Sequence, residues 1–124
     1  MPTKNKAPSL VFEALQILNN WKVDNDDQKN LLKLPDMPPR ALKRLHRGEQ
    51  EVPEDRDMLE RINCIIEIDR SLHQMFPHNG EMANYWVTTP NLQLQEQTPL
   101  KVMLAHGTEG MQTVTQQLNG ATCW

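Results

Sequence analysis

The chain has 124 residues, of which 38% are hydrophobic, 23% charged and 5% aromatic. This length suits one domain, or two small subdomains that share a core, and it excludes a TIM barrel, a kinase or a two-half Rossmann enzyme. The net charge of −3 hides an asymmetry, because residues 1–50 hold nine Lys and Arg against six Asp and Glu, whereas residues 51–124 hold four against ten. The asymmetry indicates two different partners, with chance scatter of surface charge as the alternative.

Apolar residues recur every three or four positions along most of the chain, which is the spacing of one face of a helix. A first helix is expected over residues 10–20, with Ser9 as its N-cap. Asp24 is a suitable N-cap for a second helix, which Pro35 stops. The prolines over residues 35–39 predict a stiff turn after it, because a residue before proline avoids the helical region.

Prolines and a glycine set the bounds expected for the next two helices. A short third helix is predicted over residues 39–47, since proline suits the first position of a helix and Gly48 suits the position just past its end. A long fourth helix is predicted over residues 53–76, opened by Pro53 and ended by Pro77.

A basic side of the third helix is the strongest chemical signal. Leu42 and Leu45 are expected to point inward, and the cations lie on the other side: Arg40, Lys43, Arg44 and Arg47. Two short helices, a sharp turn and a cationic helix give the order of a helix-turn-helix, in which such side chains contact phosphates and guanine edges in the major groove. The alternative is a solvated basic face on an ordinary bundle.

Aromatic residues mark the segment after the long helix. A short helix capped by Asn79 is expected to carry Tyr85 and Trp86, and a turn and a polar loop follow over residues 88–97. Large aromatic residues beside a proline-bounded loop can anchor an interface. The alternative reading places Trp86 in the core of a small C-terminal cluster. Trp124, at the end of a polar tail, either inserts into a partner or packs back.

Two further helices complete the predicted fold. Thr98 caps one that Gly107 closes, and Thr108 caps a last one that ends at residues 119–120. The predicted fold class is all-α, with a helix-turn-helix bundle followed by a small helical subdomain.

Cysteine content, targeting segments and catalytic motifs give little support for other classes. Cys64 is expected to be buried and reduced, and with His73 and His78 it lacks the paired spacing of a zinc site. No P-loop, GxSxG, HExxH or GxGxxG occurs, so no enzyme activity, cofactor or metal is predicted. No run has the length of a signal peptide core or a membrane span, and the expected location is the cytoplasm.

The motifs of the C-terminal half occur in the order of a known domain. They are Trp-Val and Pro-Asn over residues 86–91, Thr-Pro-Leu within 97–104, a glycine within 109–111 and an amphipathic segment over 114–118. Across residues 82–118 they resemble the toxin-binding domain, formerly a domain of unknown function, of the Xre/MbcA/ParS antitoxins. The sequence departs from that pattern at Val87, where leucine is common, and at Gln95 and Glu96, where glycine is typical.

The N-terminal half resembles the Xre-like helix-turn-helix part of the same antitoxins, through residues 17–21, 31–32, 42–48 and 61–62. The resemblance implies a type II toxin–antitoxin operon. Its toxin would have a RES domain and would consume NAD or transfer ADP-ribose from it. It also implies that the C-terminal half covers the entrance of the toxin's active site. The N-terminal half of such proteins dimerises and, in many members, represses the operon promoter.

The resemblance divides the chain into a flexible N-terminus at 1–8, a helix-turn-helix part with the long helix at 9–77, and a toxin-binding domain with its tail at 78–124. Operator DNA is then expected on the four cations of the third helix, and the partners are a RES-type toxin, DNA and a second copy of the chain. A plain helix-turn-helix regulator or adaptor without a toxin is the alternative. The residues expected to form or shape the toxin-binding surface are Trp86, Asn91, Pro99, Leu100, Leu118 and Trp124.

Overall fold

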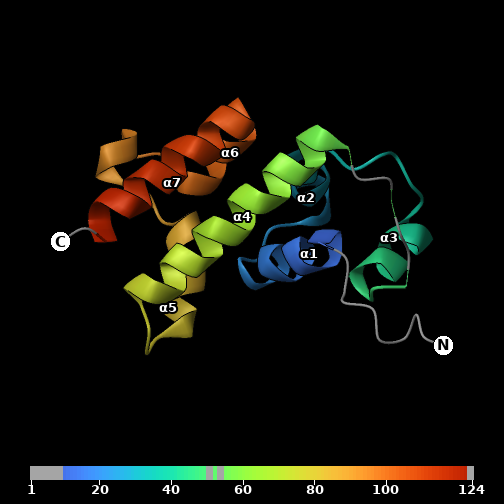
Figure 1. The fold of residues 1–124 in the computed structure, drawn as a ribbon, viewed down its shortest axis with the longest axis horizontal. Coiled ribbons are helices and arrows are strands. Elements are labelled where there is room, and N and C mark those ends of the chain that lie inside the picture. The colour runs from blue at the N-terminus through green and yellow to red at the C-terminus, as the bar shows by residue number, and fades with distance from the viewer. Residues whose placement is uncertain (1–9, 50–51, 53–54, 123–124) are drawn as a thin grey trace.

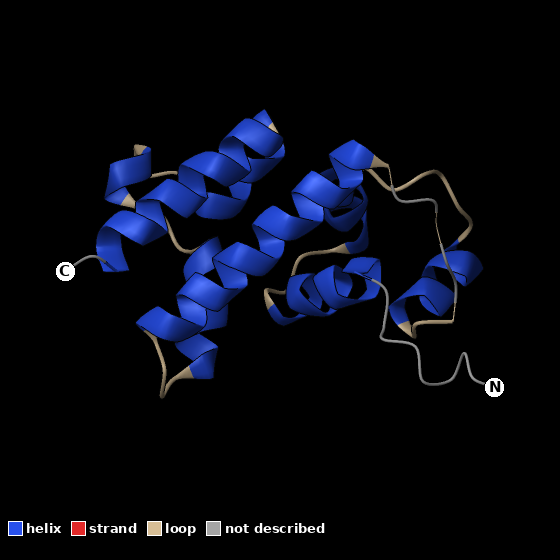
Figure 2. Cartoon of the chain, viewed as in Figure 1, coloured by secondary structure: helices blue, strands red, loops and turns tan. Residues whose placement is uncertain are grey.

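A computed structural model of the chain describes residues 10–49, 52 and 55–122, with side chains up to residue 119. Within these residues every regular element is helical, which confirms the all-α prediction (Figure 2). The α-helices are α1 (Leu10–Asn20), α2 (Asn25–Leu32), α3 (Pro39–His46), α4 (Arg56–Met75), α5 (Gly80–Tyr85), α6 (Pro99–His106) and α7 (Thr108–Thr122). Two short 3-10 helices, η2 (Trp86–Thr88) and η3 (Leu92–Leu94), lie between α5 and α6.

Several predicted helix ends are confirmed by their hydrogen bonds. The Asp24 carboxylate accepts a hydrogen bond from the Asp27 amide at 2.9 Å and caps α2. The Thr98 hydroxyl accepts one from the Lys101 amide at 3.0 Å and caps α6. Gly48 follows α3 with a φ of 77°, a left-handed conformation that glycine adopts without a steric penalty.

The predicted start of the long helix is wrong by three residues. Helix α4 begins at Arg56, not at residue 53, because the Asp55 carboxylate accepts a hydrogen bond from the Met58 amide at 2.8 Å and so occupies the N-cap position. Pro53, the proposed opener, and Ser9, the proposed cap of α1, lie outside the described residues, as does the N-terminus 1–8.

The bounds of the last helix also differ from the prediction. Helix α7 begins at Thr108 itself, because the Gly107 carbonyl accepts the first hydrogen bond, from the Met111 amide at 3.0 Å. It continues past residues 119–120 to Thr122. A single glycine inside a helix costs only about 1 kcal/mol, so Gly120 does not end it.

Helix α4 runs diagonally through the molecule, with α1 packed on one side and α7 on the other (Figure 1). The buried apolar residues form one continuous core from α1 to α7, so the two halves of the chain are not separated by solvent. The largest fully buried side chains are Trp21, Leu15, Leu18, Leu31, Leu32, Leu45, Ile62, Ile65, Ile68, Leu72, Met103 and Met111.

One buried cation joins three parts of this core. Arg61 of α4 donates through Nη1 to the Leu31 carbonyl of α2 at 3.1 Å and through Nε to the Asp57 carboxylate at 3.3 Å. Its guanidinium also packs against the turn between α6 and α7, where a Cβ on Gly107 would lie 3.0 Å from Nη2. Arg61 therefore fixes the N-terminal helices relative to the C-terminal ones.

Candidate functional site

Two exposed features lie at opposite ends of the longest axis of the molecule. Helix α3 stands at one end, and η3 lies beside α7 near the other (Figure 1). The first holds the cations predicted to bind DNA, and the second adjoins the predicted toxin-binding residues.

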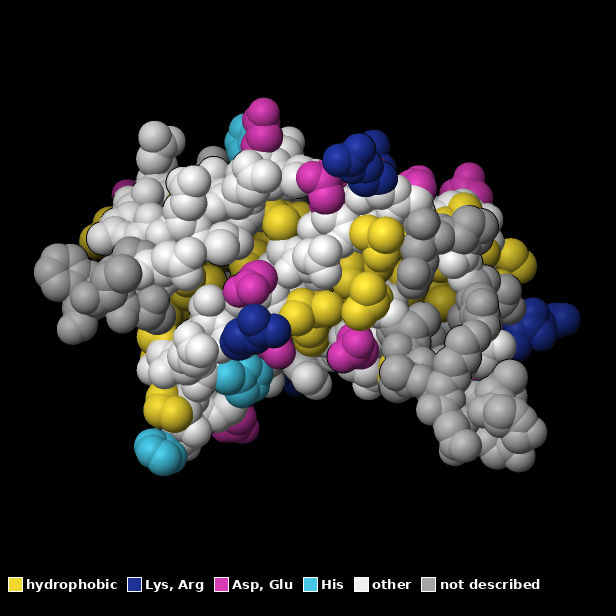
Figure 3. All heavy atoms as spheres, in the orientation of Figure 1, with side chains coloured by type: hydrophobic (Ala, Val, Ile, Leu, Met, Phe, Trp, Pro, Cys, Tyr) yellow, Lys and Arg dark blue, Asp and Glu magenta, His cyan; other side chains and the backbone are white. Residues whose placement is uncertain are grey.

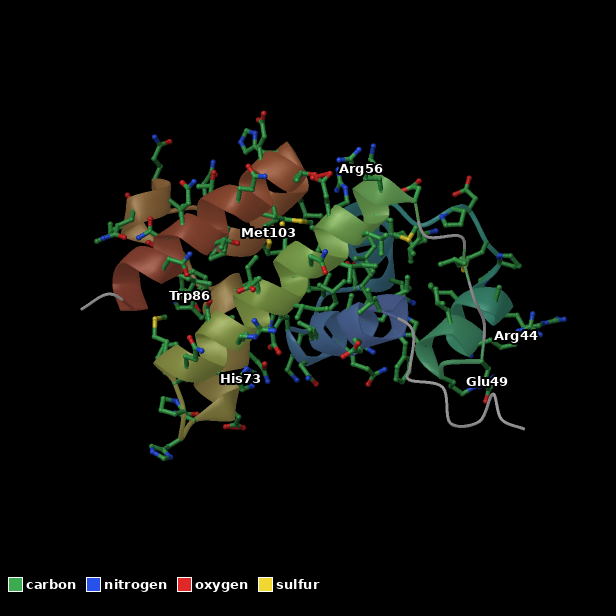
Figure 4. All side chains as sticks on the ribbon, viewed as in Figure 1. Arg44, Glu49, Arg56, His73, Trp86 and Met103 are labelled. Carbon is green, nitrogen blue, oxygen red and sulfur yellow. The ribbon has the colours of Figure 1, made fainter. Side chains whose placement is uncertain are left out.

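The basic face of α3 consists of Arg40, Lys43, Arg44 and Arg47, and all four side chains are exposed. Leu42 and Leu45 are buried on the opposite side, as the spacing predicts. Figure 4 shows Arg44 pointing away from the body of the molecule. The face is therefore open to a large anionic partner.

The cations of the basic face differ in their partners. Arg47 pairs through Nε with the Glu49 carboxylate at 3.2 Å, whereas Arg40, Lys43 and Arg44 form no ion pair with the described residues. An exposed ion pair is screened by solvent and contributes at most about 1 kcal/mol, so Arg47 can exchange Glu49 for a phosphate.

Helix α3 is held against α1 through His46. The Gln16 side chain donates to the His46 carbonyl at 3.2 Å, and the Asn19 amide nitrogen lies 3.2 Å from His46 Nδ1. Burial lowers the pKa of His46 below its usual 6.5, because the charged imidazolium is poorly solvated there. These contacts join the last residue of α3 to α1.

At the other end, a surface groove of about 440 Å³ contains two of the predicted toxin-binding residues. We call it the Trp86 groove; its lining residues are Met75, Trp86, Pro90, Asn91, Leu92, Gln93 and Gln117. Trp86 is half-buried: it packs against the core, as the core alternative expects, and also lines the groove. None of the lining side chains carries a charge, in contrast to α3.

Asn91 organises the loop that forms one wall of this groove. Its side-chain oxygen accepts a hydrogen bond from the Gln93 amide at 2.9 Å. Its backbone donates to the Gln97 carbonyl at 3.1 Å and accepts from the Glu96 amide at 2.8 Å. These bonds close residues 90–97, which we call the Asn91 loop, and they replace the polar loop of the prediction by a turn of 3-10 helix.

Two residues of the Asn91 loop adopt positive φ angles, 59° at Gln95 and 65° at Glu96. Left-handed backbone is unfavourable for residues with a Cβ. These are the two positions at which the resemblance expects glycine, and the structure supplies the reason for that expectation.

Leu92 is the residue of this site that the sequence predictions missed. It is 83% exposed, the most exposed large hydrophobic residue among those described, whereas Leu94 two positions later is buried at 8%. Periodicity gives no sign of this difference, because both leucines lie in one short polar segment.

The remaining predicted toxin-binding residues lie beneath the surface or outside the described chain. Leu118 is fully buried, Pro99 is buried as the first residue of α6, and Leu100 is partly buried against the core. These three residues can shape the surface above them but offer little area for direct contact. Trp124 lies outside the described residues.

Gly110 sets how closely α6 and α7 approach each other. A Cβ at this position would lie 2.3 Å from the Val102 carbonyl oxygen, so only glycine fits without a backbone shift. The packing of the last two helices, on which the Trp86 groove rests, therefore requires this residue.

The described residues contain no group of three or more His, Cys, Asp or Glu placed to hold a metal ion. His73 instead lies 2.9 Å from the Asp69 carbonyl and 3.4 Å from its carboxylate. Burial raises the pKa of Asp69, and His73 opposes that rise. Cys64 is a partly buried free thiol whose pKa burial also raises.

No helix of the described chain is long and apolar enough to cross a membrane.

Comparison with known families identifies the second half of the chain. Residues 71–121 match the antitoxin Xre/MbcA/ParS C-terminal toxin-binding domain. The match confirms the resemblance of the C-terminal half to the toxin-binding domain. It begins within α4 and so includes the last turn of that helix. Neither curated proteins nor solved structures gave a match to the chain.

Proposed function

We propose that this chain is a non-enzymatic antitoxin that neutralises a RES-domain toxin by covering its active site. The match of residues 71–121 to a toxin-binding domain carries the proposal, since both the Trp86 groove and the Asn91 loop belong to those residues. Residues 78–124 would make the toxin contacts, and residues 9–77 would serve DNA and dimer contacts. Such a protein acts in the cytoplasm, where its operator lies.

An antitoxin that blocks an active site needs a surface complementary to the toxin and does not need catalytic side chains. The Trp86 groove is lined by apolar and amide side chains and by no charged ones, which suits a protein partner better than a charged ligand. Trp86 and Asn91 would touch the toxin, while Pro99, Leu100 and Leu118 would hold the surface in position. No cofactor is needed for this activity.

Operator binding by the basic face is the second part of the proposal. An α-helix with its side chains is about 10–12 Å across, which fits the width of the major groove, and α3 exposes its basic side. Arg40, Lys43 and Arg44 would contact phosphates and base edges, with Arg47 joining them once it leaves Glu49. A two-fold dimer would place two such helices about one turn of DNA apart.

Dimerisation has a candidate surface on α4. Figure 3 shows apolar side chains reaching the surface in the middle of the face over α4. Leu59 and Ile66 of α4 are only partly buried and lie seven residues apart, which places them on one side of the helix. A second copy packing there would cover them.

The test is co-expression with the product of the adjacent reading frame, followed by purification and an assay of NAD loss. The proposal predicts a stable complex in which NAD is preserved, and NAD loss when the partner is expressed alone. The absence of a complex, combined with salt-sensitive binding of the chain to its own promoter, would favour a plain helix-turn-helix regulator. The exposed basic face is the observation that keeps this second candidate open.

A further inference from the structure

Leu92 is an apolar side chain held out into solvent by a structured loop. Single exposed leucines are common on protein surfaces, so its exposure of 83% is not enough to define a site. A leucine side chain gains free energy when it moves from water into an apolar pocket. The surroundings of Leu92 decide whether that gain is available for binding.

The loop fixes the position of Leu92 from both sides. On one side the Asn91 side chain accepts from the Gln93 amide at 2.9 Å, and on the other the buried Leu94 anchors the chain to the core. The Gln95 amide donates to the Leu92 carbonyl at 3.1 Å. A side chain presented in this way loses little conformational freedom when a partner covers it.

The neighbours of Leu92 make a surface with the composition of a binding centre. Met75, Trp86 and Pro90 supply apolar area in the groove, and Asn91, Gln93 and Gln117 supply neutral hydrogen-bonding groups. Interface residues that contribute most to binding are found where apolar area is combined with such groups.

We propose that Leu92 is the anchor that the toxin-binding domain inserts into an apolar pocket of its toxin, and that the Asn91 loop presents it preformed. The loop lies within residues 71–121, which argues for the toxin as the occupant. This inference rests on the proposed function and names the contact through which that function is carried out. The side chains around Leu92 are uncharged, so we expect an uncharged surface on the toxin opposite them.

The experiment measures the affinity of the full chain for the purified product of the adjacent reading frame by isothermal titration calorimetry. Leu92→Ala should raise Kd about 30-fold and Leu92→Asp about 100-fold or more, since a truncated anchor commonly costs 2 kcal/mol or more. Leu92→Met keeps the apolar volume and should stay within about threefold of the parent chain. Asn91→Ala retains Leu92 but loosens the loop, and a loss of about threefold to tenfold is expected.

Two controls separate the anchor from general damage. Gln112→Ala changes an exposed glutamine of α7 in the same domain, which lies outside the Trp86 groove and lines a different one. Met82→Asp places a charge on another exposed apolar residue of the same domain, which lines a different groove beside Asn19–Lys22. Both should bind within about threefold of the parent chain. The Leu92, Gln112 and Met82 variants should keep its thermal unfolding midpoint because these side chains are exposed.

Equal affinities of the parent chain, Leu92→Ala and Leu92→Asp would overturn the inference while leaving the proposed function intact. A loss confined to Met82→Asp would overturn it too, by moving the toxin contact to the groove beside α5. A change of oligomeric state in Leu92→Asp with unchanged toxin affinity would assign the loop to a second copy of the chain. Failure of the parent chain itself to bind would refute the proposed function instead.

Discussion

The two ends of the molecule present opposite kinds of surface. At one end, α3 projects four cations from a regular helix whose other side is buried through Leu42 and Leu45. At the other end, the Asn91 loop presents uncharged residues and an exposed Leu92 on irregular, hydrogen-bonded backbone. Coulomb attraction acts over about 8–10 Å at physiological salt, whereas an apolar anchor acts only in contact.

This difference determines how each end responds to change. A cationic face tolerates small shifts of its helix, and its binding should depend on salt. A preformed loop depends on backbone geometry within a fraction of an ångström, and its binding should depend on packing instead. Four predictions, in order of decreasing effect, test this contrast.

The largest effect is expected from removing charge at α3. The triple substitution Arg40→Ala, Lys43→Ala and Arg44→Ala should weaken binding to the promoter fragment more than 100-fold at low salt, and should reduce the slope of log Kd against log salt by about 3. Fluorescence anisotropy across a salt series measures both quantities. Toxin affinity should stay unchanged, and an equal loss of the two activities in a folded variant would refute the separation of the ends.

Glu49→Gln is the matched control for the triple variant, because it should change DNA affinity in the opposite direction. It removes the partner of Arg47 without changing α3 itself. DNA affinity should rise and the salt slope should steepen by up to about 1. Weaker DNA binding in this variant would mean that the Arg47–Glu49 pair helps to position α3. It would contradict the expectation that Glu49 competes with a phosphate for Arg47.

Packing at the loop end depends on Gly110. Gly110→Ala would force a Cβ against the Val102 carbonyl, where the space is only 2.3 Å, and should lower the free energy of unfolding by about 2–3 kcal/mol. Chemical denaturation measures the change. Gly80→Ala is the control, since no atom lies within 4 Å of its added Cβ, and its effect should stay within about 1 kcal/mol of zero. Similar losses from both substitutions would show that the close approach of α6 and α7 is not what requires Gly110.

A smaller effect is expected where the Asn91 loop holds left-handed residues. Gln95→Gly or Glu96→Gly should each raise the free energy of unfolding by about 0.5–1 kcal/mol, because glycine relieves a positive φ at the cost of some chain entropy. DNA affinity should not change, because α3 lies at the other end. Destabilisation by either glycine would show that its side chain makes a contact that outweighs the backbone strain.

The smallest effect concerns His46 and pH. Because burial lowers the pKa of His46 below 6.5, the unfolded chain binds more protons than the folded chain in the range between the two values. The contribution of neutral His46 to the free energy of unfolding should therefore be complete above about pH 6.5. It should decrease as the solution is acidified through the lowered pKa. Urea denaturation at several pH values measures this, and His46→Gln should flatten that part of the profile. If His46→Gln lost as much stability on acidification as the parent chain, the loss would belong to another titrating group.

Helix type and most helix ends could be predicted because local signals fix them. Apolar spacing, the Asp24 and Thr98 caps and Gly48 act within one or two turns of chain. The predicted start of α4 was wrong because two signals competed there. Pro53 and Asp55 both favour a helix start, and the hydrogen bond from the Met58 amide to the Asp55 side chain places the start after Asp55. Gly120 illustrates the same weakness, because a glycine signals an end only when the chain turns there.

The two candidate sites differed in how well the sequence predicts them. The basic face follows from helical spacing alone, since exposed cations and buried leucines alternate along one helix. The exposure of Leu92 follows from tertiary contacts that bury Leu94 and leave Leu92 outside, and no local pattern encodes it. The burial of Leu118 likewise depends on the position of α7 against α4.

One binding experiment on two proteins tests the separation of the two ends most directly. The parent chain and the Arg40, Lys43 and Arg44 triple alanine variant are each titrated with the product of the adjacent reading frame. We expect a tight complex with the same Kd for both proteins, because the proposed toxin contact lies at the uncharged end. No complex with the parent chain, or a complex lost in the triple variant, would contradict it.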